Sequence, residues 1–225
     1  MSLEVRCGIL MRIDMKTVYD ISVTLGEESI DFPGDTPYSR EQIFAPAGDG
    51  GYALSSLCLS AHSGTHLDAP SHFLPDGKNL DDFAVRDFIL PAQVITIRNS
   101  FSIEPAELRQ HSFARGHALL FKTENSRSCR CASGVFYKNY VYMTAEGADF
   151  CIAHKVPLVG IDYITIEKYG DTRFPVHERL LSKDILILEG LDLRSVSDGV
   201  YKLICLPLKM KNTEASPVRA VLLTE

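Results

Sequence analysis

The stretch SAHSGTHLDAPSHF, residues 60–73, decides the fold and function classes that this chain can belong to. It places three histidines and one aspartate within fourteen positions, in a chain with only seven histidines. Chance alone would rarely bring so many histidines together beside an aspartate. His62, His66 and Asp68 offer two imidazoles and a carboxylate, a donor set that holds divalent first-row metals and leaves coordination positions for water or substrate. We therefore predict a divalent metal site in this stretch.

Glycine and proline shape the backbone around these donors. Gly64 allows a close turn, and Pro70 stiffens the exit from the stretch. We expect the segment to run first as a strand end and then as a tight loop, so that the donors aim at one point. His72 follows Asp68 by four residues, which is close enough for a further metal ligand or for a group that transfers protons.

Composition favours one globular domain that acts on a small molecule. The 225 residues are 45% hydrophobic and 23% charged, and no Pro/Gly/Ser-rich or charged linker divides them, so we expect a single domain with a sizeable core. The formal net charge of −6 disfavours nucleic acid and anionic membranes as partners, because both are bound through clustered Lys and Arg. Since no apolar run reaches the roughly 18 residues of a membrane span and the start lacks a signal-peptide pattern, we expect a cytoplasmic protein.

The first fourteen residues are expected to lie outside the folded domain. Met15 opens the segment MKTVYDIS, so residues 1–14 are expected to be a loosely held extension or a remnant of cloning. Residues 15–225 are expected to form the domain.

The six cysteines lack the spacing of a zinc ribbon. Reduced thiols are the default in a cytosolic chain of this size. Cys129 and Cys131 are close together, but they lie in a polar loop without further donors nearby, so a plain loop is favoured over a metal site there.

Strand-like segments outnumber helical ones along the chain. Residues 18–25, 53–61, 92–98, 118–123, 156–162, 184–191 and 200–208 are β-branched, alternating or continuously apolar. Helices are expected at residues 102–111, 144–155 and 175–183. Ser102, Thr144 and Pro175 are residues typical of helix starts. Because the helices are too few for a regular βαβ repeat, we predict an α/β fold: a single mixed domain with a strand-rich, barrel-like β core flanked by a few helices.

The histidine-rich stretch also carries a family resemblance. Residues 62–72 match the pattern HxGTHxDxPxH, and the chain thereby resembles the metal-dependent cyclase/hydrolase family that includes kynurenine formamidases and isatin hydrolases. Similar segments recur along nearly the whole chain: FPGDTP at 32–37, VGID at 159–162, LEGL at 188–191 and LPLKMKNTEASPVRAVL at 206–222. The resemblance implies a hydrolase that uses metal-activated water on a small-molecule amide, as an arylformamidase does when it converts N-formylkynurenine to kynurenine and formate. It also implies a homodimer or larger homo-oligomer.

The same resemblance implies one or two divalent ions per chain, with zinc and manganese as the expected metals. A late histidine and a glutamate twelve residues apart complete the family's site, and His177 and Glu189 stand at that separation. One ion would be held by His62, His66, Asp68 and Glu189, and a second by Asp68, His177 and Glu189. From the residues alone, Glu189 closes the apolar run DILILE and needs a cation, an arginine or a cap. His177 is more simply explained as part of a solvated helix face.

Phe32 and His72 are the candidate substrate-binding and catalytic residues. The resemblance places Phe32 where the family has an aromatic that contacts substrate; its ring would stack on an aromatic group or anchor the loop on the core. His72 would pass a proton to the leaving nitrogen.

Two segments differ from kynurenine formamidases: residues 125–140, and Phe174, Pro175 and Val176 just before the late histidine. Both are expected to shape the pocket, so the substrate stays open between an aryl formamide and a cyclic amide, imide or lactone. A non-catalytic metal-binding protein is the third hypothesis, and its metal site would be closed by protein atoms.

Overall fold

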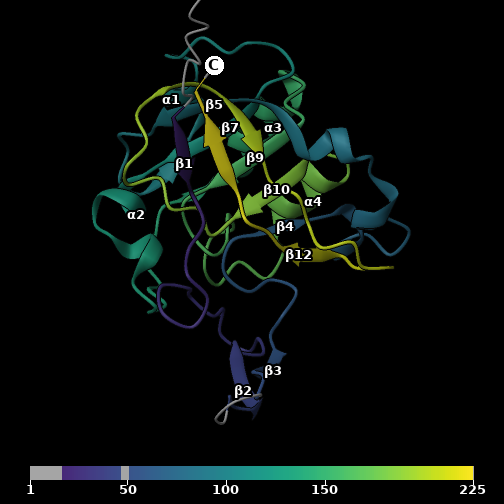
Figure 1. The fold of residues 1–225 in the computed structure, drawn as a ribbon. Helices are drawn as coiled ribbons and strands as arrows, with labels where there is room; N and C mark the ends of the chain where they lie inside the picture. Colours follow the sequence, from purple (N-terminus) through teal and green to yellow (C-terminus); the bar gives the residue numbers. More distant parts are fainter. Residues whose placement is uncertain (1–16, 47–50, 225) are drawn as a thin grey trace, which may run out of the picture.

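The computed structural model describes residues 17–46 and 51–224, so the expected extension, residues 1–14, lies outside the described residues. The described chain is built around one curled sheet of nine strands (Figure 1). In spatial order the strands are β1 (Val18–Asp20), β13 (Val221–Leu223), β11 (Gly199–Ile204), β5 (Ile89–Thr96), β7 (Ala118–Lys122), β9 (Leu158–Ile161), β10 (Leu186–Glu189), β4 (His66–Asp68) and β12 (Ala215–Pro217). The predicted α/β fold, a single mixed domain with a strand-rich and barrel-like core, is confirmed.

The middle of the sheet is parallel and its two sides are antiparallel. β5, β7, β9 and β10 pair in parallel, whereas β11 runs antiparallel to β5 and β4 runs antiparallel to β10. Parallel strands are covered on both faces and are continuously apolar. This is why β7 and β9 were recognisable in the sequence as short apolar runs.

Helices and smaller sheets surround the main sheet. The α-helices are α1 (Pro105–Leu108), α2 (Glu124–Arg127), α3 (Ala145–Ala153) and α4 (Pro175–Leu181). The 3-10 helices are η1 (Pro70–His72), η2 (Leu80–Asp82), η3 (Val85–Phe88) and η4 (Arg130–Ala132). β6 (Ser102–Ile103) pairs with β8 (Tyr142–Met143), while β2 (Ser39–Phe44) and β3 (Leu54–Cys58) form a hairpin that projects from the body (Figure 1). Within the described part of the chain, no helix has both the length and the apolar character needed to cross a membrane.

One of the three predicted helices is wrong over most of its length. The segment 102–111 begins as strand β6, and helix α1 starts only at Pro105, with Glu104 as its N-cap residue. Ser102 does not cap a helix, because its hydroxyl donates a hydrogen bond to Glu104 Oε1 at 2.7 Å. Proline lacks the backbone N–H that a helix interior needs but is tolerated in the first turn, so Pro105 sets where this helix begins.

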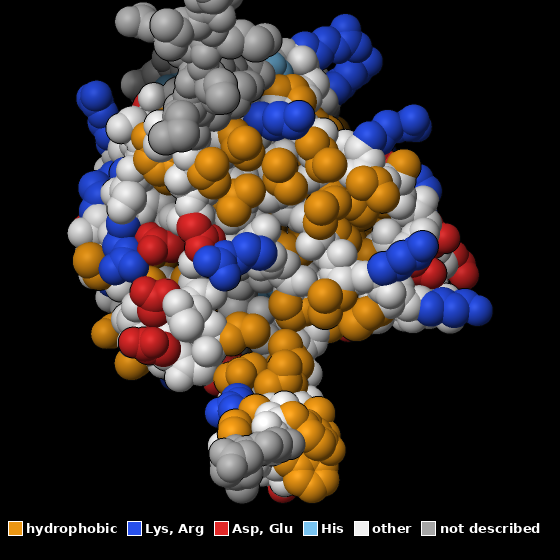
Figure 2. Space-filling model, in the orientation of Figure 1, with side chains coloured by type: hydrophobic (Ala, Val, Ile, Leu, Met, Phe, Trp, Pro, Cys, Tyr) orange, Lys and Arg blue, Asp and Glu red, His pale blue; other side chains and the backbone are white. Residues whose placement is uncertain are grey.

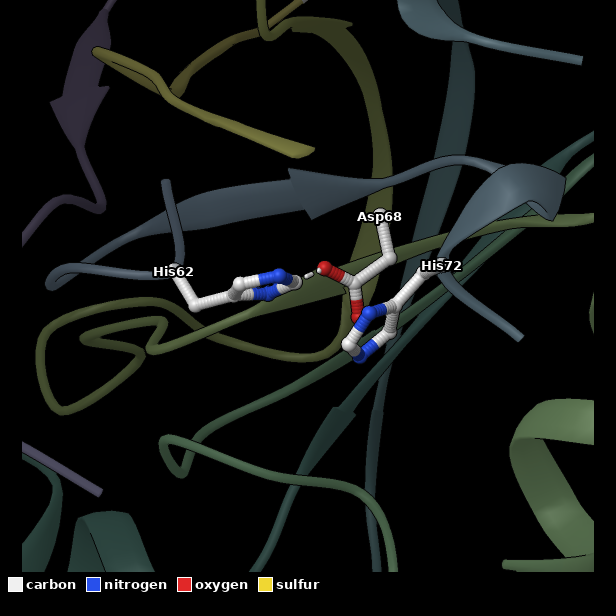
Figure 3. A group of neighbouring side chains, drawn as sticks. All are labelled: His62, Asp68 and His72. Atoms are coloured by element: carbon white, nitrogen blue, oxygen red, sulfur yellow. Dashed lines mark ion pairs between the residues drawn. The ribbon is translucent and has the colours of Figure 1, made fainter. Parts of the chain in front are cut away.

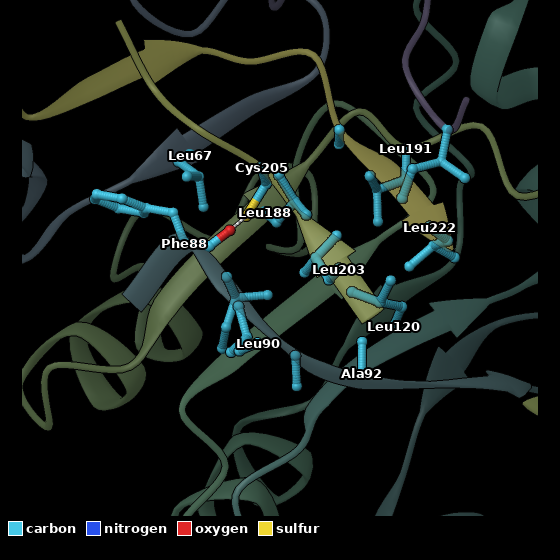
Figure 4. Close-up of a cluster of buried hydrophobic side chains, with 14 of the residues drawn as sticks. Leu67, Phe88, Leu90, Ala92, Leu120, Leu188, Leu191, Leu203, Cys205 and Leu222 are labelled. Atoms are coloured by element: carbon cyan, nitrogen blue, oxygen red, sulfur yellow. Dashed lines mark hydrogen bonds between the residues drawn. The ribbon is translucent and has the colours of Figure 1, made fainter. Parts of the chain in front are cut away.

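A hydrophobic cluster covers each face of the sheet. Alternate residues of a strand point to opposite faces. Leu120 of β7 therefore joins one cluster, which is made largely of strand residues (Figure 4). Its neighbours Leu119 and Phe121 join the other cluster, which also contains the buried apolar residues of α1, α3 and α4. The chain thus has a helix-covered face and a face that packs strand against strand.

The same alternation turns the polar residues of β4 and β10 toward the helix-covered face. Leu67 and Leu188 belong to the strand-lined cluster. The residues on either side of Leu67, which are His66 and Asp68, must then point the other way. Glu189 follows Leu188 and also points to the face where α4 packs. The apolar pattern of two short strands therefore positions three candidate metal ligands.

The turn after β10 depends on a glycine. Gly190 has a φ of +68°, and an added Cβ would overlap the carbonyl oxygen of Gly64. Gly190→Ala is expected to lower the free energy of unfolding by about 2–5 kcal/mol, from left-handed strain plus overpacking. Gly116 is the matched control, since its φ is +81° with nothing within 4 Å; Gly116→Ala should cost only about 1–2 kcal/mol. Urea unfolding of both variants measures the difference, and equal losses would contradict the close contact.

Candidate metal centre

β4 and β10 bring three candidate ligands together. His66 pairs directly with Glu189 in the antiparallel register, and Asp68 lies two residues farther along β4. Because residues two apart share one face of a strand, His66 and Asp68 point the same way. The predicted order of strand end and then loop is wrong: the turn at residues 61–65 comes first and the strand follows. The strand forms there because β4 is paired on both sides, with β10 and β12.

The remaining three histidines come from separate elements. His62 lies in the turn before β4, His72 ends the 3-10 helix η1, and His177 lies in the first turn of α4. The structure places all three next to Asp68 or Glu189. The five residues predicted as metal ligands and the predicted catalytic His72 therefore form one cluster.

Short distances join the imidazole nitrogens to the carboxylate oxygens. His66 Nε2 lies 3.5 Å from Asp68 Oδ1 and 3.3 Å from Glu189 Oε2. His177 Nε2 lies 3.7 Å from Asp68 Oδ2 and 3.4 Å from Glu189 Oε1. On the other side, His62 Nδ1 lies 2.9 Å from Asp68 Oδ1 (Figure 3). Each carboxylate thus faces at least two imidazoles.

Three buried atoms in this cluster have no hydrogen-bond partner: His66 Nε2 and both carboxylate oxygens of Asp68. His62 Nδ1 lies 2.9 Å from Asp68 Oδ1, a contact that is an ion pair when the imidazole is protonated. A buried carboxylate without a partner is costly, so this environment requires a cation. Two ligands that each lie ~2.1 Å from one tetrahedral ion are ~3.4 Å apart, and the observed separations of 3.3–3.7 Å match that spacing. The donor set therefore fits a divalent metal.

The pKa shifts of the cluster residues also indicate that the buried carboxylates need positive charge nearby. Burial lowers the pKa of His66, but Asp68 and Glu189 outweigh burial and raise it to about 9. Burial also lowers the pKa of His177, but hydrogen bonds to two buried glutamates raise it to about 10. Burial raises the pKa of Asp68, whereas His62 and His66 hold it well below its usual range. In the absence of a metal, protons on the imidazoles compensate the buried carboxylates.

His72 stands at the side of the cluster. Its ring centroid lies 4.2 Å from that of His62 and 5.8 Å from that of His177. One donor atom each of His62, Asp68 and His72 lie within 4.8 Å of one another (Figure 3), which suits either a ligand or a proton-transfer group. Burial lowers the pKa of His72 to about 4, and the nearby histidine charges act in the same direction. The imidazole is therefore neutral at pH 7, and one of its ring nitrogens carries no proton.

Glu167 is a buried residue of the site that the sequence analysis missed. Its Oε2 accepts hydrogen bonds from His177 Nδ1 at 3.0 Å and from the backbone N–H groups of Val176 and His177 at 3.1 and 3.2 Å. A carboxylate on Nδ1 leaves Nε2 to face Asp68 and Glu189. The signal was available, since Glu167 closes the apolar run YITIE just as Glu189 closes DILILE.

The cluster opens into a cavity of about 410 Å³. The lining contains five of the six cluster residues, all but Asp68, together with five aromatic side chains: His62, His66, His72, His177, Glu189, Phe32, Phe73, Tyr140, Tyr169 and Phe174. Phe32 is half-buried and packs edge-on against Phe136 at 5.5 Å between centroids, so it lines the cavity and anchors its loop as well. Tyr140 and Phe174 come from the two segments expected to shape the pocket.

The contact between Glu167 and His177 makes a prediction about metal affinity. Glu167→Gln is expected to weaken metal binding by about 10- to 100-fold, because a neutral amide orients and polarises the imidazole less well. Competition with a chelating indicator, starting from metal-free protein, measures the dissociation constant. Glu178→Gln is the matched control, since Glu178 is exposed on the same helix. Equal affinities for the wild type and Glu167→Gln would contradict an orienting role.

The sequence has known relatives over most of its length. Residues 19–168 match the model of the Cyclase family. Over 203 residues the chain is 34% identical to the kynurenine formamidase of Bacillus anthracis, which covers 90% of this chain and 95% of the relative. The kynurenine formamidase of Bacillus cytotoxicus is similar to the same extent.

Solved structures share the fold. A protein described as a predicted metal-dependent hydrolase from Bacillus stearothermophilus has a TM-score of 0.79 at 26% identity, over 93% of this chain and 99% of that chain. Isatin hydrolase A from Ralstonia solanacearum has the same fold, with a TM-score of 0.78 at 23% identity over 93% and 92% of the two chains. The family match and the identity to these relatives agree with the resemblance carried by residues 62–72, and the chain belongs to the Cyclase family.

Proposed function

We propose that this protein is a metal-dependent amidohydrolase of the arylformamidase type, which hydrolyses N-formylkynurenine to kynurenine and formate. The observation that carries the proposal is a cluster of buried imidazole and carboxylate donors that opens into an aromatic-lined cavity. The kynurenine formamidases at 34% identity support the choice of substrate.

One or two divalent ions, zinc or manganese, would be held by the five predicted ligands. His62, His66, Asp68 and Glu189 form one proposed set, and Asp68, His177 and Glu189 form the second. A bound divalent cation supplies Lewis acidity, which polarises a carbonyl and makes water nucleophilic at neutral pH. Imidazole and carboxylate donors suit both zinc and manganese, so elemental analysis of protein purified without added metal decides between them.

His72 is the proposed general acid and base. Its neutral imidazole accepts a proton from the attacking water and then donates that proton to the leaving nitrogen, so that the amide releases an amine and a carboxylic acid. Phe32 is the proposed substrate-binding residue, and its ring would stack on the aryl group. Both residues line the same cavity, which supports their proposed roles toward one substrate molecule.

The contact of the cluster with the cavity argues against a purely structural metal. A structural site is closed by protein atoms, whereas four histidines and Glu189 line the cavity here. A substrate therefore has access to the donors. Isatin serves as the test substrate for the cyclic-amide alternative: ring opening of isatin without turnover of N-formylkynurenine would favour that class.

Two histidine variants separate metal binding from proton transfer. His62→Ala is expected to reduce the metal content and the activity together. His72→Asn should keep the metal content of the wild type and lower kcat by about 10²- to 10⁴-fold, because only the proton carrier is lost. Elemental analysis and release of kynurenine from N-formylkynurenine measure the two properties.

His154→Asn is the control for these variants, since His154 is exposed and lies outside the cavity lining. It should behave like the wild type in both assays. Wild-type activity in metal-replete His62→Ala protein would overturn the proposed site, and wild-type kcat in His72→Asn would overturn the role of His72.

We also propose a homodimer or larger homo-oligomer, assembled through the hairpin of β2 and β3. Every residue of β2 is exposed, and large apolar side chains of the hairpin remain in contact with solvent (Figure 2): Ile43, Phe44, Tyr52, Leu54 and Leu57. An isolated two-stranded hairpin is marginally stable in water, and contiguous exposed apolar surface marks interaction sites. Contacts with a second copy would stabilise the hairpin.

Light scattering tests the assembly. The wild type is expected at twice the 25.0 kDa chain mass or more, whereas Leu57→Glu should shift it toward the monomer, because a charge would be buried in the interface. Val85→Glu is the control, since Val85 is 65% exposed on η3 and outside the hairpin. A monomeric wild type would refute the proposed assembly.

We place the enzyme in the cytoplasm, a proposal supported by its thiols. The five cysteines within the described residues are all free, and Cys58 and Cys129 are exposed. Free thiols are typical of reducing compartments. Detection of the native protein in a cell fraction outside the cytoplasm would contradict this location.

A further inference from the structure

Phe174 has a backbone conformation that is unusual for an aromatic residue. Its φ of +46° and ψ of +48° lie in the left-handed region, where non-glycine residues are uncommon and bulky ones are outliers. Such conformations persist only where the surrounding structure holds them, and they concentrate at functional sites. Phe174 is therefore a position whose side chain needs an explanation.

Helix capping does not explain the phenylalanine. Phe174 is the N-cap residue of α4, a position that favours Ser, Thr, Asp or Asn, and its side chain makes no capping hydrogen bond. Glu167 caps the helix instead, because it accepts from the backbone N–H groups of Val176 and His177. A glycine at position 174 would leave this cap in place and remove the backbone strain.

The position of the ring does offer an explanation. Phe174 lines the cavity and remains 38% exposed. Its centroid lies 5.2 Å from that of Phe73, and Phe73 in turn stacks on His177 at 4.7 Å and 30°. The rings of Phe73 and Phe174 therefore form a continuous aromatic wall that begins at His177, one of the candidate metal ligands.

We infer that Phe174 is a specificity-determining residue, whose ring, backed by Phe73, stacks on the aryl group of an amide substrate. The inference rests on the proposed amidohydrolase function. Aromatic rings with centroids 4.5–7 Å apart attract one another beyond the burial of their surface, so the wall favours a planar aryl group over a saturated ring of similar size. The backbone strain at position 174 is retained because it keeps this ring at the cavity.

Two variants separate the ring from the strained backbone. Phe174→Ala removes the ring but keeps a Cβ, whereas Phe174→Gly removes the ring and the strain together; Phe174→Tyr keeps the ring. Formanilide and N-cyclohexylformamide are the substrates, and each is compared with itself across the variants, so that intrinsic reactivity cancels.

Both ring-deleting variants should lower the ratio of kcat/KM for formanilide over N-cyclohexylformamide by about two- to tenfold. The change should appear mainly in KM, and Phe174→Tyr should keep the wild-type ratio. Phe174→Gly should melt about 2–4 °C above Phe174→Ala, because only glycine relieves the left-handed backbone. An unchanged ratio in folded, metal-replete Ala and Gly variants would overturn the inference, as would a loss in the Gly variant alone.

Measurements of ligand binding test the role of Phe174 independently of the proposed hydrolytic function. If the wild type hydrolyses neither of these formamides nor N-formylkynurenine, the proposed function fails, and calorimetry with acetanilide and N-cyclohexylacetamide then decides the role of Phe174. Preferential binding of acetanilide by the wild type, reduced about two- to tenfold in the Ala and Gly variants, would support it. Equal binding of both compounds by the wild type would refute it.

Discussion

Two buried carboxylates on neighbouring strands are the constraint on which the site and much of the fold depend. Asp68 and Glu189 are 0% and 3% exposed, and transfer of a lone carboxylate from water into a protein interior costs several kcal/mol. Positive charge must therefore be supplied locally. The histidines of a turn, a strand and a helix meet at these oxygens, and the carboxylates raise the pKa of two of them, His66 and His177, so that both are protonated at pH 7 when no metal is bound.

The curled sheet allows these buried carboxylates and histidines to lie beside a hydrophobic core. Leu67 and Leu188 pack into the strand-lined cluster, so the acids next to them face the helix-covered side and need no polar channel through the core. Glu167 completes the arrangement, because one carboxylate caps α4 and fixes the ring of His177 at the same time. The first turn of α4 thereby becomes part of the candidate metal site.

Local departures from folding rules coincide with the cavity. Asp68 keeps two oxygens without hydrogen bonds, and Phe174 adopts a backbone conformation that suits glycine. Natural proteins retain such departures mainly at functional sites, where stability is exchanged for chemistry. A bound cation would relieve the first departure, and the packing of Phe174 against Phe73 at the cavity wall offsets the second.

The sequence by itself determined the chemistry of the site, because residues 62–72 hold the donor types within one short segment, and its apolar runs predicted the main strands. It misplaced the first helix, which Pro105 delays, and the order of turn and strand around His66. Only the tertiary structure showed that Glu167 orients His177 and that Phe174 faces the cavity. The physical reason is distance along the chain: the pairing of β4 with β10 joins residues more than a hundred positions apart, and no local periodicity encodes such a contact.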